Sequence, residues 1–308
     1  MRARQSTLLI AAGLTVVLSR VGSMQSQPAV SWPGLWGPAR NGAAVGGRTP
    51  KRLRELWRHR SAGGYSEVVS DGSRAFTMEL KDGVDYVVAF DAQSGRERWR
   101  TRVAETYRGH DGSHDGPIST PTIAGGDLFA FGPTGHLVAL DAATGRERWR
   151  HDLVKTFAVT APVYGFGSSP LVEGPLVIIQ TGGEKSGGLM AFERATGRQA
   201  WHAPHAKTPA YASAVAATLA GTRQIIAAGG DRTFAVAPAD GRLLWSIAGP
   251  AAGEEANNSP QALPDDRVLL TFWGHGGRAQ DRETGRELDG QRDLAVASHP
   301  SVAGTDHL

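Results

Sequence analysis

The chain has 308 residues, among them 40 glycines and no cysteine, which excludes disulfides, thiolate metal sites and cysteine nucleophiles. Its formal net charge is +3, but Arg2, Arg4 and Arg20 lie within the first 26 residues, which contain no acid. Without these three of its 33 basic residues, the chain has 30 basic and 30 acidic residues, so its charge gives no argument for a nucleic-acid partner.

Residues 1–26 have the pattern of a secretory signal peptide. Arg2 and Arg4 form a basic start, an apolar run of 11 residues extends from Leu8 to Leu18, and small residues follow. We therefore expect an exported protein, periplasmic or extracellular, with an uncleaved N-terminal anchor as the alternative. The apolar run is too short for a membrane span, which takes about 20 residues, and without cysteine a lipid anchor is excluded.

Residues 27–50 form a segment rich in Trp, Gly and Pro, and residues 51–308 form a repeat region. The repeat region begins with Leu53–Trp57, whose tryptophan lies 42 residues before Trp99. We interpret this stretch as the last strand of a repeat that lacks its first three strands. In a closed ring of repeats, such a strand completes the final repeat at the C-terminus.

One eleven-residue pattern occurs five times in the repeat region. It reads AFDAQSGRERW from Ala89 to Trp99, and the copies begin 50, 52, 44 and 44 residues apart. Each copy has a short apolar strand, a turn and a second strand, and the last copy ends in Asp289 in place of Trp. The turn glycines stand where a hairpin needs positive φ: Gly95, Gly145, Gly197, Gly241 and Gly285.

The second strand of each copy ends on the repeat tryptophan. Because it recurs at the same point of the unit, we expect it to pack between neighbouring units rather than to form a platform for a ligand. In the first copy, Arg96, Arg98 and Arg100 alternate with it and are expected to face water on an outer edge strand. The repeat tryptophans, with that of the leading strand, are Trp57, Trp99, Trp149, Trp201 and Trp245.

The start of each unit is also repeated. Thr120-Pro121, Ser169-Pro170 and Ser259-Pro260 each precede a short strand and a second, more apolar strand. Four antiparallel strands repeated every 44 to 52 residues predict an all-β fold, a β-propeller of four-stranded blades. We expect about five full blades plus partial ones.

The last residues of the chain, from His299 onwards, align with the start of a unit at Thr120. They predict a sixth blade that is cut within its second strand. We therefore expect an incomplete propeller, a fragment or shortened form of a seven- or eight-bladed ring. A closed ring of five or six blades is the alternative.

The polar loops of the sequence contain only weak indications of a metal or ligand site. Two His-Asp pairs within Arg108–Gly116 would suit a divalent metal if the loop brought them together, and the acids and amides of Glu254–Asn258 would suit Ca²⁺. We favour ordinary polar loops, because nothing in the sequence enforces either geometry. The glycine-rich loop Gly182–Gly188 lacks the phosphate-loop pattern. We predict no catalytic residue and no metal site.

The repeated A-[LF]-D-x-x-[ST]-G-R-x-x-W resembles the repeat of pyrroloquinoline-quinone (PQQ)-like propellers, the family of quinoprotein dehydrogenases and of BamB. Trp32–Gly42 (WPGLWGPARNG) is similar to the opening of exported bacterial PQQ-like repeat proteins. The resemblance covers residues 32–308 and implies a β-propeller. It departs from the dehydrogenases, which carry adjacent cysteines and a Ca²⁺ site, and from BamB, which carries a lipidation cysteine.

We therefore expect an exported, non-catalytic scaffold for binding or assembly, without a cofactor, whose partner is a protein or a small ligand. The alternative is a PQQ- and calcium-dependent dehydrogenase or a degenerate relative of one. If the protein has a binding face, residues just before the first strand of each blade line one end of the propeller. These residues are His114, Asp115, Ser168, Tyr211 and Asn258.

Overall fold

A computed structural model of the protein describes residues 31–43, 52, 54–108, 116–182, 187–206, 211–248, 258–263, 266–272 and 276–280. Its regular structure is almost entirely antiparallel β-sheet, in four four-stranded sheets and one three-stranded sheet among the described residues. The expected propeller blades are thereby confirmed. The signal peptide, the expected sixth blade from His299 and most of the fifth repeat copy lie outside the described residues.

The strands of each sheet follow one another in chain order. The first blade contains β1 (Val69–Ser70), β2 (Arg74–Lys81), β3 (Val84–Asp91) and β4 (Glu97–Glu105). The second contains β5 (Thr122–Ala124), β6 (Asp127–Phe131), β7 (His136–Asp141) and β8 (Glu147–Asp152). The third contains β9 (Leu171–Glu173), β10 (Leu176–Thr181), β11 (Gly188–Glu193) and β12 (Gln199–Ala203).

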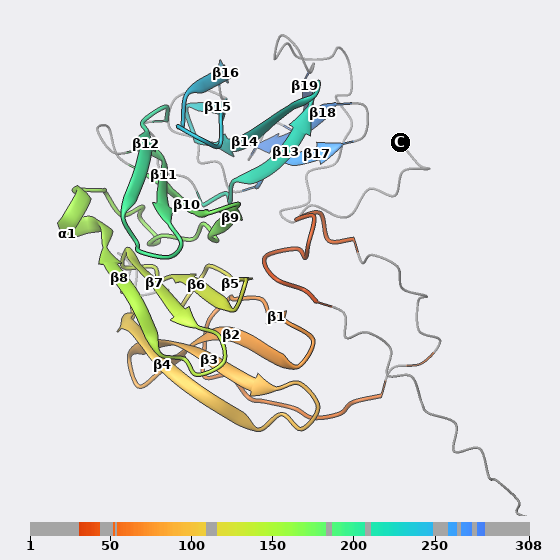
Figure 1. The fold of residues 1–308 in the computed structure, drawn as a ribbon, viewed down its shortest axis with the longest axis vertical. Helices are drawn as coiled ribbons and strands as arrows, with labels where there is room; N and C mark the ends of the chain where they lie inside the picture. The colour runs from red at the N-terminus through yellow and green to blue at the C-terminus, as the bar shows by residue number, and fades with distance from the viewer. Residues whose placement is uncertain are drawn as a thin grey trace, which may run out of the picture.

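The fourth blade contains β13 (Val215–Leu219), β14 (Thr222–Ala228), β15 (Arg232–Val236) and β16 (Leu243–Ala248). The fifth contains β17 (Gln261–Leu263), β18 (Arg267–Phe272) and β19 (Gly276–Gln280). First strands of successive blades contact each other. Figure 1 shows the described blades along an open arc, with the first strands inward and β4, β8, β12 and β16 outward.

The hydrophobic core lies in layers between adjacent blades. Phe76 and Val87 of the first blade pack with Leu128 and Val138 of the second, and similar clusters join the later blades. Because the middle strands are covered on both faces, Leu137–Leu140 of β7 are all buried, without the alternation of a one-sided sheet. The continuous apolar runs of the repeat therefore mark its inner strands.

A short helix, α1 (Leu153–Phe157), interrupts the otherwise all-β chain between β8 and β9. Its first turn is capped by Asp152, whose Oδ1 accepts a hydrogen bond from the backbone N–H of Lys155 at 3.1 Å. It ends at Ala158, which has left-handed backbone angles. The helix carries the chain from the outer strand of one blade back toward the centre.

The repeat tryptophans lie on the turn glycines of the following blade. The indole of half-buried Trp99 donates to the carbonyl of Ala142 at 3.2 Å, and a Cβ added to Gly145 would lie 2.5 Å from its Cδ2. The same contact joins Trp57 to Gly95, Trp149 to Gly197 and Trp201 to Gly241. Trp245 instead donates to Gln224 of its own blade, and Gly285 lies outside the described residues.

Two details differ from the sequence-based expectations. Trp57 occupies a repeat position, but residues 54–60 form no strand, because none of the described strands pairs with them. Arg100 does not face water; its side chain is 18% exposed and lies 2.7 Å from the buried carboxylate of Glu79. One arginine of the outer strand therefore neutralises a buried acid.

A chain of hydrogen bonds joins the starts of successive blades. The backbone N–H of Thr120 donates to Ser169 Oγ at 2.9 Å, that of Ser169 to Ser213 Oγ at 2.8 Å, and that of Ser213 to Ser259 Oγ at 2.8 Å. The N–H of Glu67 donates to Thr120 Oγ1 at 3.0 Å. The repeated Ser or Thr at the start of each unit therefore supplies the acceptor for the preceding blade.

Replacing Ser169 with alanine is expected to lower the free energy of unfolding by about 1–3 kcal/mol, because the buried N–H of Thr120 loses its acceptor. Ser169→Thr keeps the hydroxyl, as the chain itself does at Thr120, and should cost much less. Urea denaturation of both variants measures the difference. Equal losses for the two variants would mean that the hydroxyl is not what joins these blades.

Candidate functional site

Loops leading into the first strands form one end of the blades, where the sequence predicted a binding face. Ser168 lies there but is 1% exposed, and its hydroxyl donates to the carbonyl of Gln180 at 3.0 Å, so it is turned away from solvent. Tyr211 and Asn258 are half-buried. His114 and Asp115 lie outside the described residues. The structure thus leaves Tyr211 as the best-placed of the expected side chains.

Tyr211 belongs to a cluster of aromatic and apolar side chains that the sequence did not single out. Its hydroxyl accepts a hydrogen bond from the backbone N–H of Tyr164 at 3.0 Å, and the two ring centroids are 5.9 Å apart. The hydroxyl of Tyr107 donates to the carbonyl of Val163 at 3.1 Å. We call Tyr107, Val154, Val163, Tyr164 and Tyr211 the loop-face cluster.

Further close contacts occur around the loop-face cluster. A Cβ added to Gly165 would lie 3.0 Å from Tyr107, and one added to Gly135 would lie 3.0 Å from both Val154 and Phe166. Val163 is 49% exposed, and Tyr164 and Val154 are each 38% exposed. Exposed tyrosine and apolar side chains held in place are typical of protein-binding surfaces.

A histidine next to a carboxylate occurs nearby but does not form a catalytic set. Nδ1 of His136 lies 3.0 Å from Thr134 Oγ1, and its Nε2 lies 3.6 Å from Asp152 Oδ2. Burial lowers the pKa of His136, and the charge of Asp152 opposes this only in part. His136 and Asp152 face each other across the β7–β8 ladder, so their proximity follows from strand register.

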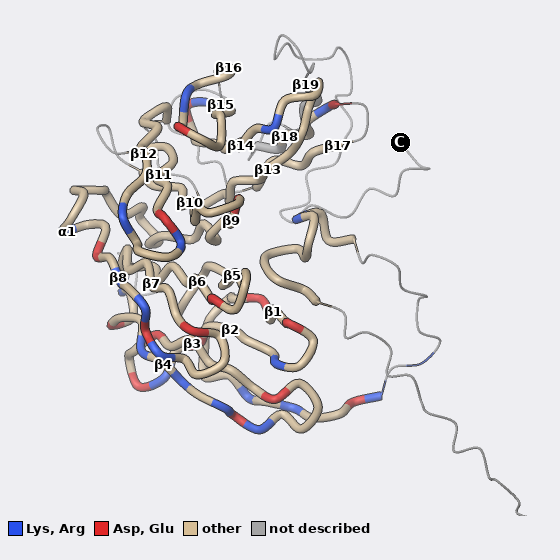
Figure 2. The backbone as a smooth tube through the Cα atoms, viewed as in Figure 1, with Lys and Arg blue, Asp and Glu red and all other residues tan. Residues whose placement is uncertain are grey.

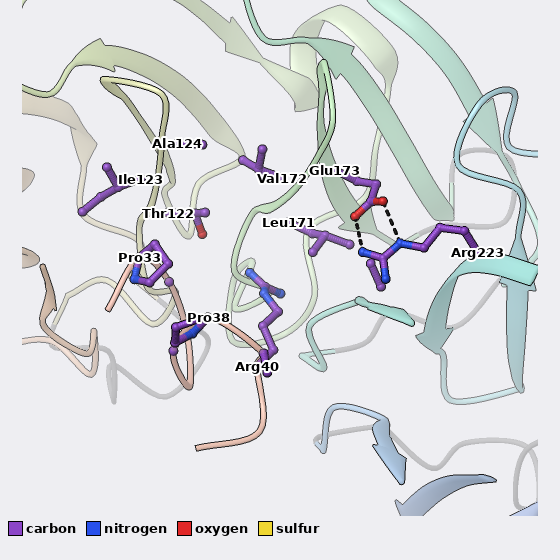
Figure 3. Close-up of a pocket in the computed structure, with 14 residues that line it drawn as sticks. Pro33, Pro38, Arg40, Thr122, Ile123, Ala124, Leu171, Val172, Glu173 and Arg223 are labelled. Carbon is purple, nitrogen blue, oxygen red and sulfur yellow. Dashed lines mark hydrogen bonds and ion pairs between the residues drawn. The ribbon is translucent and has the colours of Figure 1, made fainter. Parts of the chain in front are cut away.

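The N-terminal segment, residues 31–43, lies at the centre of the arc against the first strands. Trp32 and Ser70 exchange backbone hydrogen bonds at 2.8 Å, and the N–H of Ile123 donates to the carbonyl of Pro33 at 2.7 Å. A cavity of about 390 Å³ remains between this segment and the second, third and fourth blades. Figure 3 shows its lining, with Arg40 opposite the pair formed by Glu173 and Arg223.

Arg40 ties this segment to two blades. Its guanidinium donates to the carbonyl of Ala214 at 2.7 Å and to the carbonyl of Pro170. The hydroxyl of Thr122 donates to the same carbonyl of Pro170 at 2.6 Å. Burial lowers the pKa of Arg40 to about 10. Similarity to known openings is the one feature that marks this segment in the sequence, and no sequence pattern places it at the centre of the arc.

Charged residues are spread over the blades rather than gathered on one side. Figure 2 shows lysines and arginines beside acids along the strands and turns of each blade. Within the described ranges, no group of three or more His, Cys, Asp or Glu residues is arranged to hold a metal ion. Nor does any described helix have the length and apolar character to cross a membrane.

The chain matches the model of a protein family described as outer membrane protein assembly factor BamB. The match covers residues 49–152 and 110–306. No curated protein sequence is similar enough to match the chain.

Solved structures that resemble the chain include three alcohol or methanol dehydrogenases. The quinohemoprotein alcohol dehydrogenase of Comamonas testosteroni is 15% identical, with a TM-score of 0.64 over 86% of this chain and 49% of its own. Quinohemoprotein alcohol dehydrogenase ADHIIG of Pseudomonas putida HK5 is 15% identical, with a TM-score of 0.57 over 85% and 48%. A europium-containing methanol dehydrogenase is 16% identical, with a TM-score of 0.54 over 76% and 52%. The chain spans about half the length of these structures, and the likeness shows a shared fold.

Proposed function

The chain belongs to the family described as outer membrane protein assembly factor BamB, and from this premise we propose that it is an exported, non-catalytic scaffold that binds a protein partner during assembly. The observation that carries the proposal is the loop-face cluster. It exposes Val163 and Tyr164 at the end of the blades where the loops between successive blades meet, and Val154 on the neighbouring helix α1.

The geometry of the cluster suits binding with little loss of conformational freedom. The Tyr211 hydroxyl holds the backbone of Tyr164, and the Tyr107 hydroxyl holds the carbonyl of Val163. Because such hydrogen bonds already fix the exposed loop, it loses less conformational entropy when a partner binds. This supports Tyr164 and Val163 as the anchors of the interface.

The dehydrogenase alternative finds no support in the residues that the structure describes. Ca²⁺ takes about six to eight oxygen ligands, largely from carboxylates. The central cavity has a single acid in its lining, Glu173, whose two oxygens bind Arg223 at 2.8 and 2.7 Å. These residues do not fit a calcium-bound quinone.

Site-specific photo-crosslinking in the native host tests the proposal. A photoreactive amino acid at Val163 is expected to form an adduct with one partner protein. The same amino acid at Arg98, on the outer strand β4 and 44% exposed, should form little adduct. Tyr164→Asp should lower the adduct yield from Val163 about tenfold, the effect of losing an interface anchor, while the melting temperature stays close to that of the parent.

Two results would contradict the proposal. Equal adduct yields from positions 163 and 98 would mean that the loop-face cluster is ordinary surface. Stoichiometric binding of PQQ in the presence of Ca²⁺, measured by calorimetry on the full chain, together with dye reduction by an alcohol, would establish the dehydrogenase instead.

A further inference from the structure

The buried guanidinium of Arg40 has no counter-charge in the part of the chain that the structure describes. The residue is 9% exposed, and its polar partners there are the carbonyl oxygens of Pro170 and Ala214. Each of these takes one N–H, from Nη2 and Nη1 respectively, which leaves the other N–H groups of the guanidinium without an acceptor among the described residues. Arg40 also lines the central cavity.

A buried charge without an ion-pair partner is unfavourable, because it has lost most of its contact with water and no opposite charge replaces that contact. The hydrogen bonds to the two carbonyl groups offset part of this loss. A neutral donor would make the same two hydrogen bonds, so they do not explain why a charged side chain stands here. The other cation of the cavity, Arg223, is already neutralised by Glu173. The cavity therefore has room and a net positive charge that is localised at Arg40.

From these contacts we propose that the central cavity binds a small organic carboxylate, with its oxyanion against Arg40. One unpaired guanidinium matches the single charge of a carboxylate better than the double charge of a phosphate monoester. The body of the ligand lies against the apolar part of the lining, which includes Ile123, Leu171 and Val172. A volume of about 390 Å³ is within the range of small-molecule sites.

The site depends on the N-terminal segment as well as on the blades. Pro33, Pro38 and Arg40 close one side of the cavity, while β5, β9 and the residue pair Glu173 and Arg223 form the other (Figure 3). This gives the segment a role beyond holding the blades together. The inference does not rest on the proposed scaffold function, because the loop-face cluster and the cavity share no residue.

Calorimetry on the full chain with benzoate and with benzyl alcohol tests the proposal. The two probes have similar size, and only benzoate carries a charge. Benzoate is expected to bind with one-to-one stoichiometry and about tenfold or more tightly than benzyl alcohol, the ratio that a charge-assisted hydrogen bond gives. Equal affinities, or no binding of benzoate, would overturn the proposal.

Variants at Ala216, which lines the cavity on β13, test the site without removing Arg40. Ala216→Glu introduces a carboxylate into the lining of the cavity that Arg40 also lines, and Ala216→Gln has nearly the same shape without the charge. The Glu variant is expected to melt at a higher temperature than the Gln variant and to lose benzoate binding. If the Gln variant is the more stable of the two, or if the Glu variant still binds benzoate, the cavity is not a carboxylate site.

Discussion

Replacing Gly145 with alanine is expected to lower the free energy of unfolding by about 3 kcal/mol or more, because two separate costs add. Gly145 has φ of +72°, a region that costs any other residue about 1–2 kcal/mol. The new Cβ would also lie 2.5 Å from the ring of Trp99 and 2.8 Å from Thr101 Oγ1, which the tightly packed contact between blades cannot absorb without moving.

Gly126, in the same blade, is a matched control for this substitution. Its φ is +87°, and a Cβ there meets no atom within 4 Å, so Gly126→Ala carries the backbone cost alone. Urea denaturation of both variants separates the two costs. In a Trp99→Ala background, the effect of Gly145→Ala should fall toward that of Gly126→Ala, and the remaining difference is the contact with Thr101 Oγ1. Equal losses at the two glycines in the parent chain would show that the tryptophan contact contributes nothing.

The fold follows from the sequence to the extent that the repeat encodes it. The strand that ends on Trp99 and the turn at Gly145 recur at matching points of the unit, so any one copy predicts the others. The sequence does not predict the helix at Leu153–Phe157, because five residues are too few to show a helical period and its N-cap, Asp152, is also the last residue of a strand.

The candidate site was harder to predict, because it rests on features that the repeat does not contain. Ser168 does precede a first strand, β9, as the sequence predicts. The position of a residue in the chain does not, however, determine whether its side chain points toward solvent. Tyr164 has no counterpart in the other copies. Arg40 reaches carbonyls 130 and 174 residues further along the chain, and no local pattern specifies such contacts.

Replacing Asp85 with asparagine is expected to stabilise the protein at pH 7.5 and to have little effect at pH 4. Asp85 lies in β3 with no exposed surface, and burial raises its pKa from 3.8 to about 6. The nearby Thr106 hydroxyl offsets part of this effect, and the charge of Glu105 adds to it. Asp85 therefore keeps its proton up to a higher pH in the folded state than in the unfolded state.

The sign of the pH dependence follows from this raised pKa. Between pH 3.8 and about 6 the folded state binds the proton more tightly than the unfolded state, so stability falls as pH rises through this window. Above it, the ionised carboxylate costs up to about 3 kcal/mol, the free energy that corresponds to a shift of about two pKa units. Asparagine keeps the shape of the side chain and removes the charge, so its benefit should grow over the same window.

Thermal denaturation of Asp85→Asn at several pH values measures this growth. Asp82→Asn is the control, because Asp82 is exposed on the hairpin turn next to Asp85 and its substitution changes the net charge by the same amount. If the benefit of Asp85→Asn at pH 4 equals that at pH 7.5, its cause is packing or hydrogen bonding rather than charge. If both variants gain equally at pH 7.5, the effect belongs to the net charge of the protein. A gain confined to Asp85→Asn and to the higher pH identifies a carboxylate whose burial destabilises this blade near neutrality.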